Sequence, residues 1–186
     1  MGENYNDITE AAFRHIKGQR HDFMNYLQVI YGYIQMGRRE AAMGYIMKVN
    51  NRMLLEGRLG GLDDKGLYLA ISEFAATCYR HNVETELCCM ESYISYGINT
   101  ENISKELEAF TCAGDTIGDH LEESEAASPK VYMYLHEENN KRAFIAATEE
   151  IALEGIYERP WKVYEGSDLI DVCLTDGAML LKIQLS

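Results

Sequence analysis

The sequence predicts an α+β protein in two parts: a helical hairpin, followed by a sandwich of helices on a β-sheet. In the first third of the chain, apolar residues recur at alternating spacings of three and four, which is typical of amphipathic helices. Further along, helical patterns are interspersed with short runs in which apolar and polar residues alternate, as in β-strands. We expect one domain over residues 1–60 and a second over residues 61–186, with Gly60 and Gly61 at the boundary.

The N-terminal helices are expected to form the hairpin. The first helix has a heptad-like seam interrupted by a single charged residue: Phe13, Ile16, Arg20, Phe23, Leu27, Ile30 and Ile34. Asp7 or Thr9 can cap the start of this helix, and Gly37 is placed to end it. The second helix continues the spacing to about Gly57 through four apolar residues: Ala42, Ile46, Val49 and Met53.

A lone helical hairpin leaves its apolar seam uncovered. Two copies cover both seams when they form a four-helix bundle, so homodimerisation is a structural expectation. The alternative is that the hairpin packs on the rest of its own chain.

The second part begins with a helix expected over residues 63–81, a strand over 83–90 and a helix over 103–123. Two strand pairs follow. Residues 131–136 and 143–148 flank a turn of Glu and Asn, and residues 168–174 and 179–185 flank Asp176-Gly177. This order predicts helices on one face of a sheet.

Composition limits the class of function. The chain has 17 lysines and arginines against 30 aspartates and glutamates, a net charge of −13, and most of the acidity follows Leu62. Because an acidic surface repels phosphate backbones, we expect no nucleic-acid partner. No apolar run reaches the roughly 20 residues of a membrane span, and the first residues are polar and acidic. We therefore expect a cytoplasmic protein without a membrane partner.

The segment from Arg20 to Gln28 carries the candidate chemistry. His21 lies one position past the seam, so its imidazole is expected to face solvent, with Asn25 and Gln28 one and two turns along the same stripe. A histidine ring is mostly neutral at cell pH and has a lone pair for attack on phosphorus. The adjacent carboxylate of Asp22 can accept a hydrogen bond from the other ring nitrogen, which fixes the tautomer and raises the basicity.

By itself, a His-Asp pair on a helix is more often a surface feature without a role. Here, however, RHDFMNYLQVIYGYIQMGRREAAMGYI resembles the phosphoacceptor hairpin of the sporulation initiation phosphotransferase B family and of sensor kinases that share its helical domain. The resemblance covers about residues 10–58, and the matching residues are Arg20, His21, Asp22, Asn25, Leu27, Gln28, Val29, Ile30 and Gly32. It implies that His21 is phosphorylated, beside Asp22, and that Asn25 and Gln28 position the phosphoryl group or the partner.

The family's kinases carry a GHKL-type ATP-binding domain after the hairpin, and the resemblance implies a degenerate form of that α/β sandwich here. Where the family has two asparagines four residues apart, this chain has Asp115 and Asp119, whose carboxylates repel a polyphosphate. The glycine-rich phosphate loops are missing as well. We therefore expect no autophosphorylation with ATP and no cofactor of its own. An unrelated α+β domain is the alternative.

The resemblance implies a transferase of a two-component phosphorelay. A phosphoryl group would move between aspartates of response-regulator receiver domains through a phosphohistidine at His21, in sporulation control, with Mg²⁺ in the receiver's own acidic pocket. One alternative is a non-catalytic dimeric scaffold or regulator that binds a response regulator or a histidine kinase. Another is a diverged kinase in which Asp115 and Asp119 hold metal.

We expect no metal site in the chain itself. Its five cysteines are unevenly spaced and include no CxxC pair, which is typical of free thiols in a reducing compartment. His81, His120 and His136 are scattered along the sequence and are expected to be structural or solvated.

Overall fold

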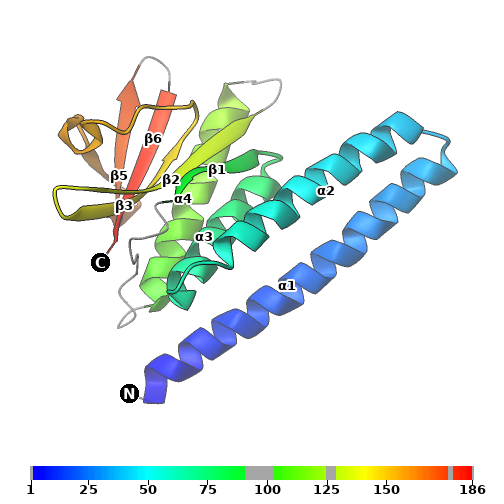
Figure 1. The fold of residues 1–186 in the computed structure, drawn as a ribbon, viewed down its shortest axis with the longest axis horizontal. Coiled ribbons are helices and arrows are strands. Elements are labelled where there is room, and N and C mark those ends of the chain that lie inside the picture. Colours follow the sequence, from blue (N-terminus) through cyan, green and yellow to red (C-terminus); the bar gives the residue numbers. More distant parts are fainter. Residues whose placement is uncertain (1, 91–102, 125–128, 176–177, 186) are drawn as a thin grey trace. The chain divides into compact units, whose positions relative to one another are not determined.

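The computed structural model describes residues 2–90, 103–124, 129–175 and 178–185 (Figure 1). The chain divides into two compact units, Met1–Gly61 and Leu62–Ser186, named unit 1 and unit 2 below. Unit 1 is helical and unit 2 combines helices with a sheet, so the predicted α+β class is confirmed. None of the helices among the described residues is long and apolar enough to cross a membrane.

Unit 1 is a helical hairpin of α1 (Gly2–Gln35) and α2 (Arg39–Leu59). The prediction that Asp7 or Thr9 caps α1 is wrong, because both residues lie within the helix. Between Gly2 and Asp7 the chain has no proline and no further glycine, so nothing in its composition stops the helix from extending toward the N-terminus.

The turn between the two helices is set by Gly37, as predicted. Gly37 has φ of +68°, a left-handed conformation that glycine adopts without steric cost. The Arg38 amide donates to the Tyr33 carbonyl at 2.9 Å, and the Gly37 amide donates to the Ile34 carbonyl at 3.0 Å. These two bonds are the Schellman pattern, which satisfies the last carbonyls of α1 and reverses the chain.

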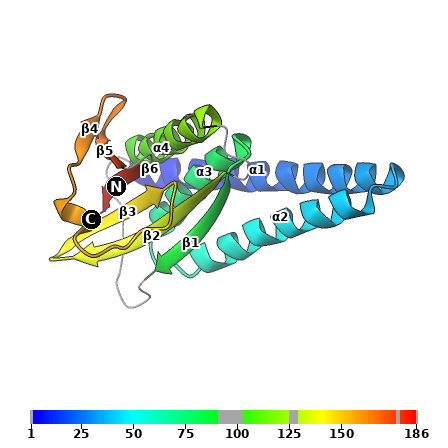
Figure 2. The same ribbon diagram turned by 90° about the horizontal axis from the view of Figure 1, so that it is seen from above.

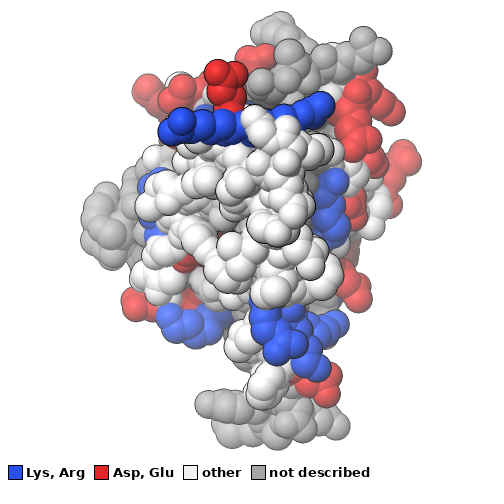
Figure 3. All heavy atoms as spheres, turned by 90° about the vertical axis from the view of Figure 1, so that its right-hand side faces the viewer, with Lys and Arg blue, Asp and Glu red and all other residues white. Residues whose placement is uncertain are grey.

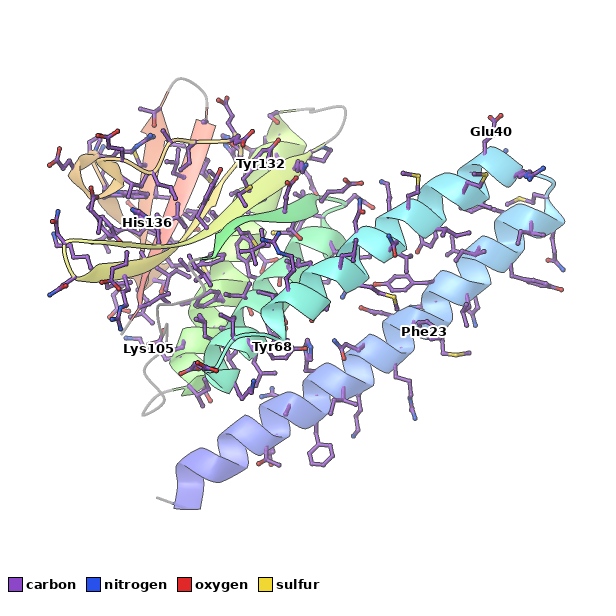
Figure 4. All side chains as sticks on the ribbon, in the orientation of Figure 1. Phe23, Glu40, Tyr68, Lys105, Tyr132 and His136 are labelled. Atoms are coloured by element: carbon purple, nitrogen blue, oxygen red, sulfur yellow. The ribbon has the colours of Figure 1, made fainter. Side chains whose placement is uncertain are left out.

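Tyrosine rings join the two helices of unit 1. Tyr45 of α2 lies between Tyr26 and Tyr33 of α1, with ring centroids 6.2 Å apart in each pair. Tyr26 and Tyr33 each come one residue before a seam residue of α1. They therefore lie about a quarter turn around the helix from the apolar seam, since each residue advances the helix by roughly 100°. The hairpin contact therefore leaves most of the seam exposed: Phe13, Ile16, Phe23, Leu27 and Ile34 on α1, and Ile46 and Met53 on α2. Phe23 is labelled in Figure 4.

Unit 2 contains the remaining elements. In chain order these are α3 (Lys65–Arg80), β1 (Glu84–Met90), α4 (Ile103–Glu123), β2 (Lys130–Glu138), β3 (Lys141–Ala147), the 3₁₀ turn η2 (Ile156–Glu158), β4 (Lys162–Tyr164), β5 (Ser167–Thr175) and β6 (Ala178–Leu185). Asp64 caps α3, where its carboxylate accepts a hydrogen bond from the Leu67 amide at 2.7 Å.

The six strands form one mixed sheet in the order β1-β2-β3-β6-β5-β4. Strand β1 is parallel to β2, and all other neighbouring strands are antiparallel. Both predicted strand pairs are confirmed, and the first turns through Asn139 and Asn140, which have positive φ. The predicted turn at Asp176-Gly177 lies outside the described residues. Strand β4 was not predicted, because three residues are too few for a periodic signal.

Helices α3 and α4 pack together and cover one face of the sheet (Figure 2). Phe74 of α3 and Phe110 of α4 each place their ring centroid 5.0 Å from that of Phe144 on β3. The opposite face is covered by residues 149–161, here named the strap, which includes η2. Five apolar strap residues pack against that face: Ile151, Leu153, Ile156, Tyr157 and Trp161.

Two tyrosines fix the strap to the sheet. The Ile151 amide donates to the Tyr134 hydroxyl at 3.1 Å, and the Tyr157 hydroxyl lies 2.8 Å from the Lys141 carbonyl, to which it donates. Burial raises the pKa of both phenols to about 12, and in Tyr157 the nearby Glu138 adds to the effect. Both phenols are therefore neutral in the folded protein at neutral pH, and their ionisation is unfavourable to the fold.

We expect unit 2 to lose stability between about pH 10 and pH 12. In that range these phenols ionise in the unfolded chain, where a tyrosine titrates near 10, but stay protonated in the folded one. The folded state thus binds more protons, so the free energy of unfolding falls as pH rises. Urea unfolding at successive pH values measures the slope. Tyr157→Phe should reduce the slope, and an unchanged slope would contradict this assignment.

Candidate functional site

The predicted site residues lie on one stretch of α1, and His21 faces solvent as expected. The His21 side chain is 75% exposed, and Asn25 and Gln28 are exposed as well. The Asn25 amide nitrogen lies 3.2 Å from His21 Nδ1, one helical turn away. The structure thus brings His21 and Asn25 together, while Gln28 lies one further turn along the helix.

Asp22 turns toward α2 instead of the imidazole. Its Oδ1 lies 3.6 Å from His21 Nδ1, beyond hydrogen-bond distance, and its Oδ2 accepts a hydrogen bond from Arg52 of α2 at 3.0 Å. The expected hydrogen bond from the ring to Asp22 is therefore not formed in this structure. The physical reason is helical geometry, since successive residues point about 100° apart and residues four apart lie one above the other.

Arg52 is the residue that sequence reasoning missed. Its side chain is 17% exposed, and its guanidinium donates to the Tyr26 hydroxyl as well as to Asp22. The guanidinium carbon also lies 5.7 Å from the centroid of the Tyr26 ring. A signal existed: Asp22 and Arg52 are equally distant from Gly37 along the chain, so a hairpin folded at that glycine brings them level.

The contact between Asn25 and His21 couples the asparagine to the ring tautomer. An amide NH₂ that faces Nδ1 donates to its lone pair, and the ring proton then lies on Nε2. With the amide turned over, its oxygen accepts the Nδ1 proton and the lone pair of Nε2 is free. In either orientation of the amide, this contact favours one ring nitrogen over the other as the nucleophile.

Asp115 and Asp119 of α4 both lie close to a histidine. Asp115 Oδ1 lies 3.1 Å from His81 Nε2, and Asp119 Oδ1 lies 3.7 Å from His81 Nδ1. Glu122 Oε1 lies 2.9 Å from the same Nδ1. Burial lowers the pKa of His81, but the hydrogen bonds to Asp115 and Glu122 outweigh it, so the pKa is raised overall.

His136 has a packing role, in line with the sequence expectation. It lies on β2 (Figure 4), and its ring stacks on that of Tyr157 in the strap, with centroids 6.0 Å apart and an interplanar angle of 20°. The Tyr157 hydroxyl also lies 3.1 Å from the His136 carbonyl.

Comparison with known proteins bears on unit 1. Residues 1–60 match the family model described as the sensor kinase SpoOB-type alpha-helical domain. The match covers α1 and α2 and includes His21, Asp22, Asn25 and Gln28. No curated protein matches the chain. Over residues 1–60, the family match confirms the resemblance seen in the sequence: unit 1 is similar to the alpha-helical domain of SpoOB-type sensor kinases.

Proposed function

We propose that this chain is a histidine phosphotransferase, which carries a phosphoryl group on His21 between aspartates of response-regulator receiver domains. The main support is the position of His21 in a SpoOB-type helical domain, with a solvent-exposed ring whose Nδ1 is in contact with Asn25. An exposed imidazole on a helix can enter the active pocket of a partner. The receiver supplies the Mg²⁺ that neutralises charge on the phosphoryl group.

The transfer needs few groups from this chain. When the Asn25 amide is turned over, so that its oxygen accepts the Nδ1 proton, the Nε2 lone pair attacks the phosphorus of a receiver phosphoaspartate. A P–N bond forms, the P–O bond to the aspartate breaks, and its electron pair stays on the receiver carboxylate. The phosphorylated ring is cationic while Nδ1 keeps its proton, and the nearby Asp22 stabilises that charge. Arg52 holds Asp22 in place, and Gln28 lies where the receiver docks.

The exposed seam supports a homodimer in which two hairpins form a four-helix bundle. Five apolar side chains of α1 are between 44% and 61% exposed along the seam: Phe13, Ile16, Phe23, Leu27 and Ile34. A second copy can cover them with the same apolar surface. Figure 3 shows the molecule from the side of the α1–α2 turn, and much of the surface nearest the viewer carries no charged side chains.

Leu27→Asp should convert the dimer into a monomer. Leu27 is 46% exposed in the single chain, so a carboxylate there is tolerated by the hairpin but would be buried without a partner in the bundle. Sedimentation velocity measures the mass. Leu174→Asp, at an exposed position of β5 in unit 2, is the matched control and should stay dimeric. A Leu27→Asp protein that keeps the dimer mass would show that the seam is not the interface.

We further propose that unit 2 is a degenerate ATPase-like domain of the GHKL type that does not use ATP. Its order of helix, strand, helix and strand pairs supports this interpretation. Asp115 and Asp119 put negative charge where the family binds polyphosphate, and both lie against His81. A titration with ATP and Mg²⁺ should detect no binding. Measurable affinity would favour a diverged kinase.

Transfer from a phosphorylated receiver domain, without ATP, tests the proposed function. The purified protein should acquire a phosphate that is labile in acid and stable in base, as expected for phosphohistidine, and should lose it to a second receiver. A protein that binds the receiver but remains unphosphorylated would contradict the proposal and favour the non-catalytic scaffold.

A further inference from the structure

The part of α1 that leads up to His21 is basic, although the chain as a whole is acidic. Residues 1–61 carry eight lysines and arginines against six aspartates and glutamates, a net charge of +2, whereas the whole chain has a net charge of −13. Three of these cations precede His21 by seven residues or fewer: Arg14, Lys17 and Arg20, named the basic patch below. All three residues are exposed, and α1 contains no other lysine or arginine.

Helical spacing places two cations of the basic patch on the same face of α1 as the imidazole. Lys17 precedes His21 by four residues and Arg14 precedes it by seven, so they lie one and two turns from the ring along one stripe. Seven residues span about 10 Å of helix, which is close to the Debye length of about 10 Å in 0.1 M salt. Both cations therefore act on a charged group that approaches the ring.

Little negative charge offsets the basic patch. Asp22 is the one carboxylate between residues 11 and 37, and its Oδ2 is bound by Arg52 of α2 at 3.0 Å. Glu10 lies one turn before Arg14 and can offset only one of the three charges. The face of α1 before His21 thus keeps a positive potential, which attracts an anionic partner.

We propose that Arg14 and Lys17 form a docking surface for the acidic rim of the receiver domain that exchanges phosphate with His21. The identity of this partner rests on the proposed function. A receiver presents its phosphoaspartate in an acidic pocket, so its surface beside the reacting phosphorus is anionic and complements the basic patch. Charges at the rim of an interface determine how fast partners associate and which partners are repelled, while the chemical step depends on other groups.

The salt dependence of receiver association in the wild-type protein tests this docking surface without any variant. The probe is an isolated, unphosphorylated receiver domain of net negative charge, labelled with a fluorophore and mixed by stopped flow. If net charge controlled the encounter, the two acidic proteins would repel and salt would speed association. The basic patch reverses the sign: association should slow at least about tenfold between about 0.01 M and 1 M salt, as the Debye length falls from about 30 Å to about 3 Å. Association that is independent of salt, or faster in salt, would overturn the proposal.

Arg14→Gln/Lys17→Gln should slow association by about fivefold at low salt and have no effect at about 1 M salt. Glutamine has a helix propensity close to that of the residues it replaces. Arg38→Gln/Arg39→Gln removes the same charge from exposed residues at the α1–α2 turn and should associate like the wild type. Arg20 stays in place, because it lies in the seam and its replacement would also change the dimer interface.

Two results with these variants would contradict the docking surface. Equal losses in both variants would show a general effect of charge. Equal rates in the wild type and Arg14→Gln/Lys17→Gln would show that receivers do not use these cations, as expected if the basic patch binds only the acidic unit 2 of a second copy.

The rate of phosphoryl transfer separates this inference from the proposed function. With a saturating concentration of phosphorylated receiver, Arg14→Gln/Lys17→Gln should acquire phosphate as fast as the wild type, whereas its kcat/KM at low salt should fall about fivefold. A loss at saturation would overturn the docking role, because the two cations would then act in the chemical step. Association that depends on the basic patch, without transfer to the wild-type protein, would retain the docking surface and reject the phosphotransferase.

Discussion

His21→Ala should abolish phosphoryl transfer from a phosphorylated receiver domain. The variant removes the only group that we assign as the nucleophile, and neither Asn25 nor Asp22 can form the phosphohistidine in its place. The side chain is 75% exposed, so its loss should leave the hairpin folded and dimeric. The measurement is the fraction of protein that carries phosphate after mixing with the receiver, together with the mass of the variant in solution.

His15→Ala is the matched control for this experiment. His15 lies six residues before His21 on the same helix, and nothing in the family resemblance gives it a chemical role. Its replacement should leave transfer near the wild-type level. Transfer that survives His21→Ala, or that is lost equally in His15→Ala, would contradict the assignment of the nucleophile.

Phe144→Ala should have the largest effect on stability, lowering the free energy of unfolding of unit 2 by about 3–5 kcal/mol. Phe144 is fully buried, and its ring contacts Phe74 and Phe110 from the two helices that cover the sheet. Alanine leaves a cavity at the point where these three elements meet, and the surrounding side chains cannot fill it completely. Urea unfolding followed by circular dichroism measures the loss.

Leu174→Ala is the control for this substitution. Leu174 is 62% exposed on β5, so its truncation should change the free energy of unfolding by no more than about 0.5 kcal/mol. A loss below about 1 kcal/mol in Phe144→Ala would contradict a core built around these three rings.

The elements predicted well are those with strong local signals. The heptad-like spacing located α1 and α2, and Gly37 located the turn because its left-handed conformation is a property of glycine itself. The alternating runs located the strands from β2 to β6, apart from β4. The start of α1 was placed too late, because Asp7 and Thr9 can cap a helix but do not require one to begin.

Features that depend on contacts between distant segments could not be predicted from the sequence. The strap covers the second face of the sheet, and two hydrogen bonds between distant residues hold it there. One joins the Ile151 amide to the Tyr134 hydroxyl, and the other joins the Tyr157 hydroxyl to the Lys141 carbonyl. The group around His81 forms only when α3 and α4 pack together. Such contacts arise from tertiary packing and leave no period in the sequence.

The candidate site was partly predictable. The phase of the seam placed the His21 ring in solvent, and the spacing of four residues placed Asn25 beside it. The role expected for Asp22 was less accurate, because adjacent residues on a helix do not face each other. Its partner Arg52 comes from the second helix, and finding it required the hairpin to be folded at Gly37.

Locating the phosphate tests the central claim most directly. Wild-type protein phosphorylated by a receiver domain would be digested at alkaline pH, where phosphohistidine is stable, and its peptides sequenced by mass spectrometry. We expect one phosphate, on His21. A phosphate on His15 or another residue, or no phosphate at all after binding of the receiver, would contradict the claim that His21 is the phosphoryl carrier.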